Sequence, residues 1–272
     1  MEFLWTYPSF INEIDDVLSN IGISLFGILI AIGIVILMIY TLKSFDKFQD
    51  KRMTDWDLLI LCASFLVLWG GAALFDHLYH YIETGSFQGG ITYASGFICG
   101  IITFIVLEKV ILHIDFKGSL KKLNIMMPFI ALAQFFGRLG CFTAGCCFGK
   151  PTDSIFGVVF PANTDAGVMY PNTPIHPTQL YEAVLCLLLF IFLFIGSKKI
   201  SYIKKHTLSF YLMIYGTFRL ILELFFRGDD RGLLLGVSPS TIVTIIMIIG
   251  GAVLLFVPKM KEEVKTLENA QK

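Results

Sequence analysis

Charge is scarce throughout this sequence. Only 15% of the 272 residues are charged, while 56% are hydrophobic and the mean hydropathy is +0.74. An average soluble domain carries roughly 25% charged residues. The low charge and the 26 phenylalanines exclude a disordered chain, and a net charge of zero excludes a basic nucleic-acid binder. The composition therefore predicts an integral membrane protein.

The first 20 residues lack lysine and arginine, and no small-residue cleavage site follows them. Because a secretory signal peptide needs both features, we expect the first apolar run to remain as a permanent membrane helix. Apolar runs near the length of about 20 residues that a bilayer requires recur along the chain. They predict an all-α, polytopic integral membrane protein, with one membrane domain over residues 1–272 and about seven transmembrane helices. The predicted spans are Ile21–Leu42, Trp56–Phe75, Tyr93–Leu112, Pro128–Phe142, Gln179–Ile195, Leu208–Phe226 and Thr241–Val257.

Positive charge is nearly missing from every second connection between these spans. Four alternate connections together hold three Lys or Arg, and the other four hold fifteen. Because positively charged connections stay in the cytoplasm, this asymmetry predicts the N-terminus outside and the C-terminus inside. Residues 258–272 then form a cytoplasmic tail. The long connection over residues 143–178 lies outside, and its length predicts an extracytoplasmic functional loop.

Four ionisable residues stand out inside the predicted spans, where such groups are costly and face a protein interior or a water-filled cavity. Arg138 lies near the outer end of the fourth span. Arg219, Glu223 and Arg227 follow at four-residue intervals in the sixth, which predicts one polar helix face running inward from the outer boundary. Internal pairing would make this set a packing device. The arginines outnumber the carboxylates, even with Glu182 included, which favours a phosphate, and a phospholipid headgroup is its nearest abundant source.

The segment from His176 to Glu182 begins the fifth predicted span. Pro177 disfavours helix at the residue before it, so the helix is expected to start directly afterwards. One interpretation is a plain helix N-terminus with an interfacial tyrosine and an early acidic residue. The other is a polar network beside the arginine face, in which Gln179, Tyr181 and Glu182 contact substrate.

Six cysteines are present, and three of them lie in spans, where we expect packing roles: Cys62, Cys99 and Cys186. Cys141, Cys146 and Cys147 lie instead in a glycine-rich segment on the predicted outer side. Four interpretations are open: a disulfide from Cys141 to Cys146 or Cys147, a reactive thiol near Arg138, inert packing, or a metal site with His176 as fourth ligand. The spacing is not typical of zinc, so no metal or other cofactor is expected.

The order of these motifs resembles the bacterial prolipoprotein diacylglyceryl transferase family, and the resemblance covers most of the chain. It rests on three motifs: Gly137-Arg138-Leu-Gly140-x-Phe142-x-x-Gly145-x-x-Phe148-Gly149, His176-Pro177-x-Gln179-Leu180-Tyr181-Glu182 and Tyr215-Gly-x-x-Arg219-x-x-x-Glu223-x-x-x-Arg227. That family has seven spans with the N-terminus outside, an orientation that the charge asymmetry gives independently.

The resemblance implies a lipid transferase of the bacterial cytoplasmic membrane whose site faces outside. The family moves a diacylglyceryl group from phosphatidylglycerol to the lipobox cysteine thiol of a secreted prolipoprotein, so that a thioether forms and glycerol phosphate leaves. By motif match, Arg138 binds the headgroup, Arg219 polarises the phosphate and Glu223 orients Arg219. The catalytic residues expected are Arg219, Glu223, His176 and Cys146. The substrate-binding residues expected are Arg138, Gly140, Cys141, Gly149, Gln179, Tyr181, Glu182 and Arg227.

The chain departs from the family pattern in the groups that handle protons. Phe26 stands where the family has tyrosine, and Ala94 where it has histidine. Cys141 and Cys146 stand where it has asparagine and glutamate, which leaves His176 as the candidate base. Two alternatives follow from these departures: a paralogue with thiol redox or thiol-acyl chemistry at the three outer cysteines, or a non-enzymatic lipid-binding or transport protein.

Overall fold

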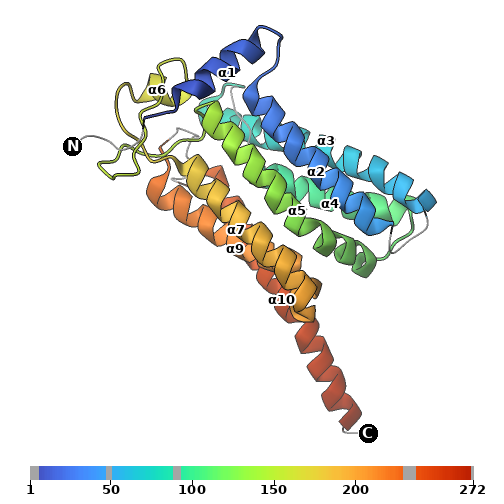
Figure 1. The fold of residues 1–272 in the computed structure, drawn as a ribbon. Coiled ribbons are helices and arrows are strands. Elements are labelled where there is room, and N and C mark those ends of the chain that lie inside the picture. The colour runs from blue at the N-terminus through green and yellow to red at the C-terminus, as the bar shows by residue number, and fades with distance from the viewer. Residues whose placement is uncertain (1–5, 47–50, 88–92, 229–236, 271–272) are drawn as a thin grey trace.

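The computed structural model describes residues 6–46, 51–87, 93–228 and 237–270, and most of them are helical (Figure 1). Seven helices in this described part are long and apolar enough to cross a membrane, which confirms the all-α, polytopic prediction. They are α2 (Leu25–Phe45), α3 (Lys51–Thr84), α4 (Tyr93–Ile111), α5 (Phe116–Thr143), α7 (Thr178–Lys199), α9 (Thr207–Ile221) with its continuation η1 (Leu222–Phe226), and α10 (Pro239–Ala270). Three residues counted in the charge asymmetry lie outside the described residues: Lys47, Arg231 and Lys272.

Three short helices complete the chain: α1 (Ser9–Ser19), α6 (Asp165–Met169) and α8 (Ser201–Lys205). The loop between α5 and α7 contains α6, turns and isolated β-bridges. Figure 1 shows α1, α6 and this loop together at one end of the bundle, while α10 leaves the bundle at the other end. Helix α1 and the end of α10 thus lie at opposite ends of the molecule, as an odd number of spans requires.

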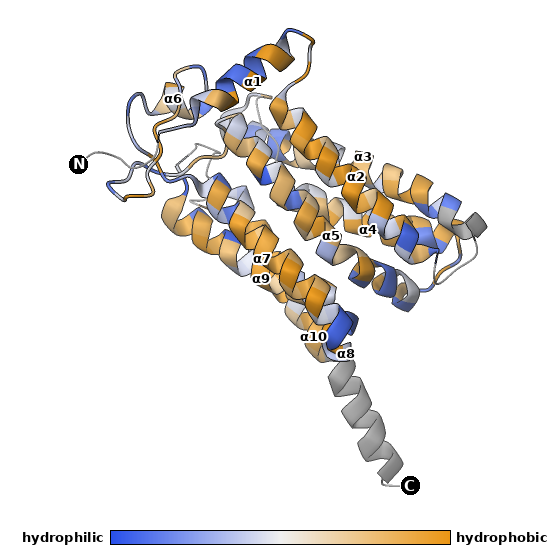
Figure 2. Cartoon of the chain, viewed as in Figure 1, coloured by the Kyte–Doolittle hydropathy of each residue, from blue (hydrophilic) through white to orange (hydrophobic). Residues whose placement is uncertain are grey.

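Helix ends are set by ordinary capping chemistry. The Ser24 side chain accepts a hydrogen bond from the Gly27 N–H at 3.1 Å, and Asp115 caps α5 by accepting from Gly118 at 3.0 Å. The last turns of α2, α4 and α7 carry lysines, which suit the negative end of the helix dipole. Figure 2 shows the long helices as largely hydrophobic, with hydrophilic residues gathered toward their ends.

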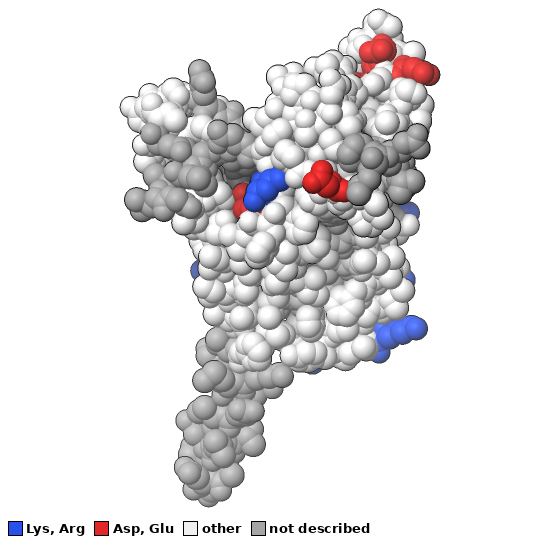
Figure 3. Space-filling view, turned by 90° about the vertical axis from the view of Figure 1, so that its left-hand side faces the viewer, with Lys and Arg blue, Asp and Glu red and all other residues white. Residues whose placement is uncertain are grey.

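The long helices pack as two groups joined through α5. Helix α5 packs against α2 on one side and α7 on the other, α3 packs against α4, and α9 packs against α10. Large apolar side chains such as Leu66, Val110 and Phe225 remain exposed on the outside of this bundle. In Figure 3, charged side chains are almost absent from the waist of the visible face, and those that show lie nearer one end and along the edges. This surface suits contact with lipid acyl chains.

The fourth predicted span, Pro128–Phe142, is too short, because α5 begins twelve residues earlier, at Phe116. The early part of the helix carries lysines that the sequence analysis placed in a connection. Lys122 lies inside the bundle, where its Nζ is 2.8 Å from Asp57 and 2.8 Å from Glu108. Two carboxylates from α3 and α4 thus compensate one buried ammonium group.

A proline also lies inside α5, where its missing N–H would leave the carbonyl of the preceding turn without its helical donor. The carbonyl four residues before Pro128 belongs to Asn124, and it accepts a hydrogen bond from the Thr207 hydroxyl. A side chain from α9 therefore replaces the lost helical bond, and α5 continues through the proline.

The predicted polar face of the sixth span is confirmed for its first step, from Arg219 to Glu223. Arg219 and Glu223 pair at 3.0 Å as i, i+4 neighbours. Residues Leu222–Phe226 then form a π-helical turn, whose wider winding breaks the regular spacing. Arg227 ends the helix, its backbone forms a bridge with Gly149, and its buried side chain lies close enough to act electrostatically on Glu182.

Candidate active site

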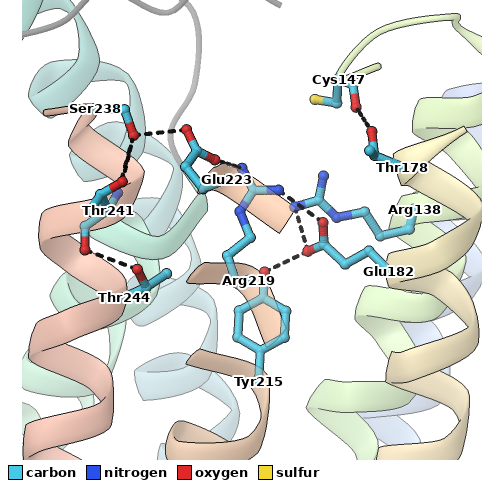
Figure 4. Close-up of polar contacts among 10 residues, drawn as sticks. All are labelled: Arg138, Cys147, Thr178, Glu182, Tyr215, Arg219, Glu223, Ser238, Thr241 and Thr244. Carbon is cyan, nitrogen blue, oxygen red and sulfur yellow. Dashed lines mark hydrogen bonds and ion pairs between the residues drawn. The ribbon is translucent and has the colours of Figure 1, made fainter. Parts of the chain in front are cut away.

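Helices α5, α7 and α9, with the continuation η1, bring two arginines and two glutamates together (Figure 4). Arg138 on α5 lies 2.9 Å from Oε1 of Glu182 on α7. Arg219 on α9 lies 3.1 Å from Oε2 of the same carboxylate and 3.0 Å from Glu223. The Tyr215 hydroxyl, one turn before Arg219, donates to Glu182 Oε1 at 2.6 Å. The structure thus unites all three sequence motifs in one cluster.

The cluster is almost entirely removed from solvent, since Arg138 is 8% exposed, Arg219 4% and Glu182 1%. Buried charges require partners, and each guanidinium here has a carboxylate. A guanidinium carries five N–H donors, and the ion pairs use one from Arg138 and two from Arg219. Both arginines therefore keep donors for an anionic ligand, although internal pairing already holds them in place.

A cavity of about 900 Å³ opens onto this cluster, and both Arg138 and Arg219 lie in its wall. Away from the arginines the wall becomes apolar, with side chains from α2, α3, α4 and α5: Phe26, Ile30, Leu61, Leu68, Phe104, Leu123, Met126 and Ile130. One end therefore suits an anion and the other suits hydrocarbon, so the cavity matches an amphiphile with a phosphate headgroup.

The three outer cysteines meet in the wall of the same cavity. The sulfur atoms of Cys141, Cys146 and Cys147 all lie within 4.8 Å of one another, and all six cysteines of the chain are thiols in this structure. The loop carrying them is tied to the start of α7. Thr178 Oγ1 donates to the Cys147 carbonyl at 2.8 Å, and Gln179 Nε2 donates to the Cys146 carbonyl at 2.7 Å. Hydrogen bonds to the neighbouring sulfurs, followed by burial, raise the pKa of Cys146 well above its usual range.

The structure places His176 and Tyr181 outside the wall of this cavity. His176 Nδ1 and the Tyr181 hydroxyl are 3.1 Å apart, and the imidazole packs edge-to-face on Phe226 with ring centroids 5.1 Å apart. Burial lowers the pKa of His176 from its ordinary value of 6.5, which favours the neutral ring. Neither residue belongs to the cavity wall within the described part of the chain. The candidate base is therefore not brought to the arginine cluster.

The two candidate glycines lie at close backbone approaches. A Cβ on Gly140 would be 3.0 Å from the Phe26 ring, so the absence of a side chain lets α2 and α5 approach closely. A Cβ on Gly149 would be 2.6 Å from the His176 Cβ, at the point where the loop crosses the start of α7. The fully buried Gln179 holds the cysteine loop through its hydrogen bond to the Cys146 carbonyl. These residues shape the site from outside the cavity wall.

Three further residues of the site had no role assigned from the sequence, although Tyr215 was part of a quoted motif. Tyr215 precedes Arg219 by four residues, and that helical spacing was the available signal. Gln134 precedes Arg138 by four residues, lines the cavity and accepts from the Tyr211 hydroxyl at 2.7 Å. His80 also lines the cavity. Its Nδ1 lies 3.8 Å from Asp76, another i, i+4 pair on α3 that the sequence analysis assigned to a connection.

The fold and the site together define a polytopic membrane protein with two buried, ion-paired arginines at the polar end of a largely apolar cavity. Comparison with known sequences identifies the family: a profile described as prolipoprotein diacylglyceryl transferase matches residues 16–257. The chain belongs to this family, which confirms the resemblance drawn from the motifs.

Three curated relatives carry the name phosphatidylglycerol–prolipoprotein diacylglyceryl transferase. The Clostridium tetani protein is 40% identical over 144 residues, or 53% of this chain and 56% of the relative. A Clostridium perfringens protein, named with the suffix 2, is 38% identical over 146 residues, or 53% of this chain and 55% of its own. The chain therefore matches only about half the length of these two relatives. The Rickettsia conorii protein is 28% identical over 267 residues, covering 92% of this chain and 97% of the relative.

Proposed function

We propose that this chain is a phospholipid-dependent transferase, which moves a diacylglyceryl group from phosphatidylglycerol to a cysteine thiol of a secreted prolipoprotein. Family membership and the names of the relatives support this reaction. The observation that carries it is the position of Arg138 and Arg219 at the polar end of a cavity whose remainder is apolar. The headgroup phosphate binds between the guanidiniums, and the acyl chains extend along the apolar wall.

The arginine cluster suits departure of a phosphate. The acceptor thiolate attacks the glyceryl carbon, a C–S bond forms, and the C–O bond to phosphate breaks. The electron pair leaves with glycerol phosphate. Arg138 and Arg219 stabilise the negative charge that gathers on the phosphate oxygens, an effect that is strong in a site shielded from water. Glu182 and Glu223 hold the two guanidiniums in place, and Tyr215 fixes the Glu182 carboxylate.

The proposed location is the bacterial cytoplasmic membrane, with the site facing outside. The arginine cluster lies toward the end of the bundle that carries α1 and α6, whereas the lysine-bearing last turns of α2, α4 and α7 lie at the other end. Because positive connections remain in the cytoplasm, this polarity supports an external N-terminus and an external site. A secreted prolipoprotein and an outer-leaflet phospholipid then reach the same face.

Complementation tests this proposal. The chain is expressed in bacteria depleted of their own diacylglyceryl transferase, and the mass of a reporter prolipoprotein is followed. A mass increase equal to one diacylglyceryl group is expected with the wild-type chain and with Lys150→Ala, which removes an exposed cation of the outer loop. Arg138→Ala and Arg219→Ala should give no increase. An unmodified reporter beside a correctly inserted wild-type chain would contradict the proposal and favour a lipid-binding protein.

A further inference from the structure

We propose that Cys141, Cys146 and Cys147 form a three-thiolate site for Zn²⁺, whose fourth coordination position binds and deprotonates the acceptor thiol. The inference rests on the proposed function and extends it. The transfer requires a thiolate nucleophile, because the thiol itself attacks poorly. Phe26 and Ala94 in the cavity wall have no group that takes up a proton. A metal ion bound by the three sulfurs makes the acceptor thiol acidic enough to give its proton to water or to His80 in the cavity wall.

The arrangement of the sulfurs fits one metal ion. A tetrahedral zinc site with Zn–S bonds of about 2.3 Å has sulfur atoms about 3.8 Å apart. The three sulfurs here already lie within 4.8 Å of one another, so small side-chain rotations bring them to a shared ion. Thiolate ligands favour Zn²⁺ over Mg²⁺ or Ca²⁺, which prefer oxygen.

The backbone is shaped to bring adjacent cysteines together. Neighbouring side chains in an extended chain point to opposite sides, yet Cys146 and Cys147 direct their sulfurs to one point. Cys147 achieves this in the left-handed region, at φ 60°, which is a costly conformation for a residue with a side chain. Figure 4 shows the Cys147 sulfur pointing toward the side on which the two guanidiniums lie. Such local strain is typical of functional positions.

Rigid elements hold the three thiols from two sides. Cys141 belongs to the last turn of α5, one turn beyond Arg138. The carbonyls of Cys146 and Cys147 are bound by Gln179 and Thr178 at the start of α7. A site built on helix ends in this way needs little rearrangement to accept an ion.

The ligand number points to a catalytic rather than a structural site. Structural zinc takes four protein ligands, whereas catalytic zinc takes three and leaves one position open. Among the described residues, the group contains the three cysteines alone. His176, the fourth ligand considered from the sequence, is engaged with Tyr181 instead. Because the cysteines line the cavity that also reaches Arg138, the open position faces the bound phospholipid.

The chemistry balances without an oxidant or a reductant. A thiol that binds Zn²⁺ loses its proton, which passes to water or to His80 in the cavity wall. The metal-bound thiolate attacks the glyceryl carbon as the C–O bond to phosphate breaks. The product is a neutral thioether, a weaker ligand than a thiolate, so it leaves the metal. Zinc keeps its oxidation state throughout.

Metal content gives the first test. The full-length protein is purified in detergent under reducing conditions, loaded with Zn²⁺, freed of excess metal and measured by mass spectrometry. We expect one zinc ion per chain in the wild type and in Cys62→Ser, whose cysteine is exposed on α3. Cys146→Ser should lose at least tenfold in zinc affinity.

If Cys146→Ser does not fold, chelation and re-addition of Zn²⁺ to the wild type replace the comparison. A wild-type chain that stays free of metal, or that forms a Cys141–Cys146 disulfide and binds no zinc after reduction, would overturn the proposal.

Cobalt substitution tests the fourth position without any need for turnover. The Co²⁺-loaded protein is mixed with a synthetic peptide containing one cysteine, and with the same peptide containing serine. The cysteine peptide alone should intensify the sulfur-to-cobalt charge-transfer band. No spectral response to the cysteine peptide would overturn the proposal.

The metal site and the proposed lipid transfer can be refuted separately. Lipid transfer that continues at full rate in the chelated wild type and in Cys146→Ser would refute the metal site and leave the proposed function intact. A cysteine-specific cobalt spectrum in a chain that transfers no lipid to any thiol would support the metal site and refute the proposed function.

Discussion

Arg138 and Arg219 share one counter-ion: the two oxygens of Glu182 each accept from a different guanidinium, at 2.9 Å and 3.1 Å. The arginines belong to helices on either side of α7, so the carboxylate fixes the distance between two positive groups. A headgroup phosphate that binds both guanidiniums takes over part of this role. Under the proposed function, Glu182 therefore keeps the two guanidiniums close together until the phosphate binds.

Replacing Glu182 with glutamine should destabilise the protein strongly. The substitution preserves the shape of the side chain but leaves two buried guanidiniums without their shared negative charge. Breaking a buried ion pair costs about 3–5 kcal/mol of unfolding free energy. Thermal unfolding in detergent should show a large decrease for Glu182→Gln and none for Glu13→Gln, whose side chain is exposed on α1. Equal stability of the two variants would show that the pairing contributes little.

Lysine should not replace either arginine. It keeps the charge but cannot offer the planar pair of donors that binds two oxygens at once. Removing one such donor from an oxyanion site lowers kcat by about 10²-fold or more. We therefore expect Arg138→Lys and Arg219→Lys to lose about this much transfer activity in membrane vesicles while the chain still folds. A lysine variant with wild-type kcat would mean that positive charge alone is sufficient.

Filling the apolar part of the cavity should weaken lipid binding selectively. Ile130 lies in the cavity wall, so Ile130→Trp occupies space assigned to an acyl chain. If overpacking of this kind weakens lipid binding by about 1–3 kcal/mol, KM for phosphatidylglycerol rises about 5- to 160-fold. Ile102→Trp is the matched control, because Ile102 is 55% exposed on the outer face of α4. If both variants keep the wild-type KM, the acyl chains lie elsewhere.

The long apolar helices could be predicted from sequence because their hydrophobic runs are a local property. The start of α5 could not. In the sequence, Lys122 resembles a residue of a polar connection. Its burial is compensated by ion pairs with Asp57 and Glu108, which belong to other helices. The π-turn before Arg227 has no local signature either, so the regular four-residue spacing did not predict this change in winding.

The candidate site, too, could be predicted from the sequence only in part. The sequence placed three charged motifs at the outer side, and helix packing was needed to show that Glu182 lies between Arg138 and Arg219. Spacing alone argued against a metal at the three cysteines, because it is not typical of zinc. The left-handed conformation of Cys147 is a tertiary property, and it is what brings the sulfurs together.

The environment of His176 predicts an acid-dependent loss of stability. Burial lowers its pKa below the ordinary value of 6.5, so the folded protein binds fewer protons than the unfolded chain as the pH falls through that value. The unfolding free energy is therefore expected to decrease below about pH 6.5 and to be fully retained above it. His176→Asn should flatten this dependence in thermal unfolding between acidic and neutral pH. His113→Asn, which changes an exposed histidine, should leave it unchanged.

Because His176 contacts Tyr181 and Phe226 outside the cavity wall, His176→Asn should also retain transfer activity at neutral pH. Loss of activity at neutral pH with unchanged stability would instead identify His176 as the base.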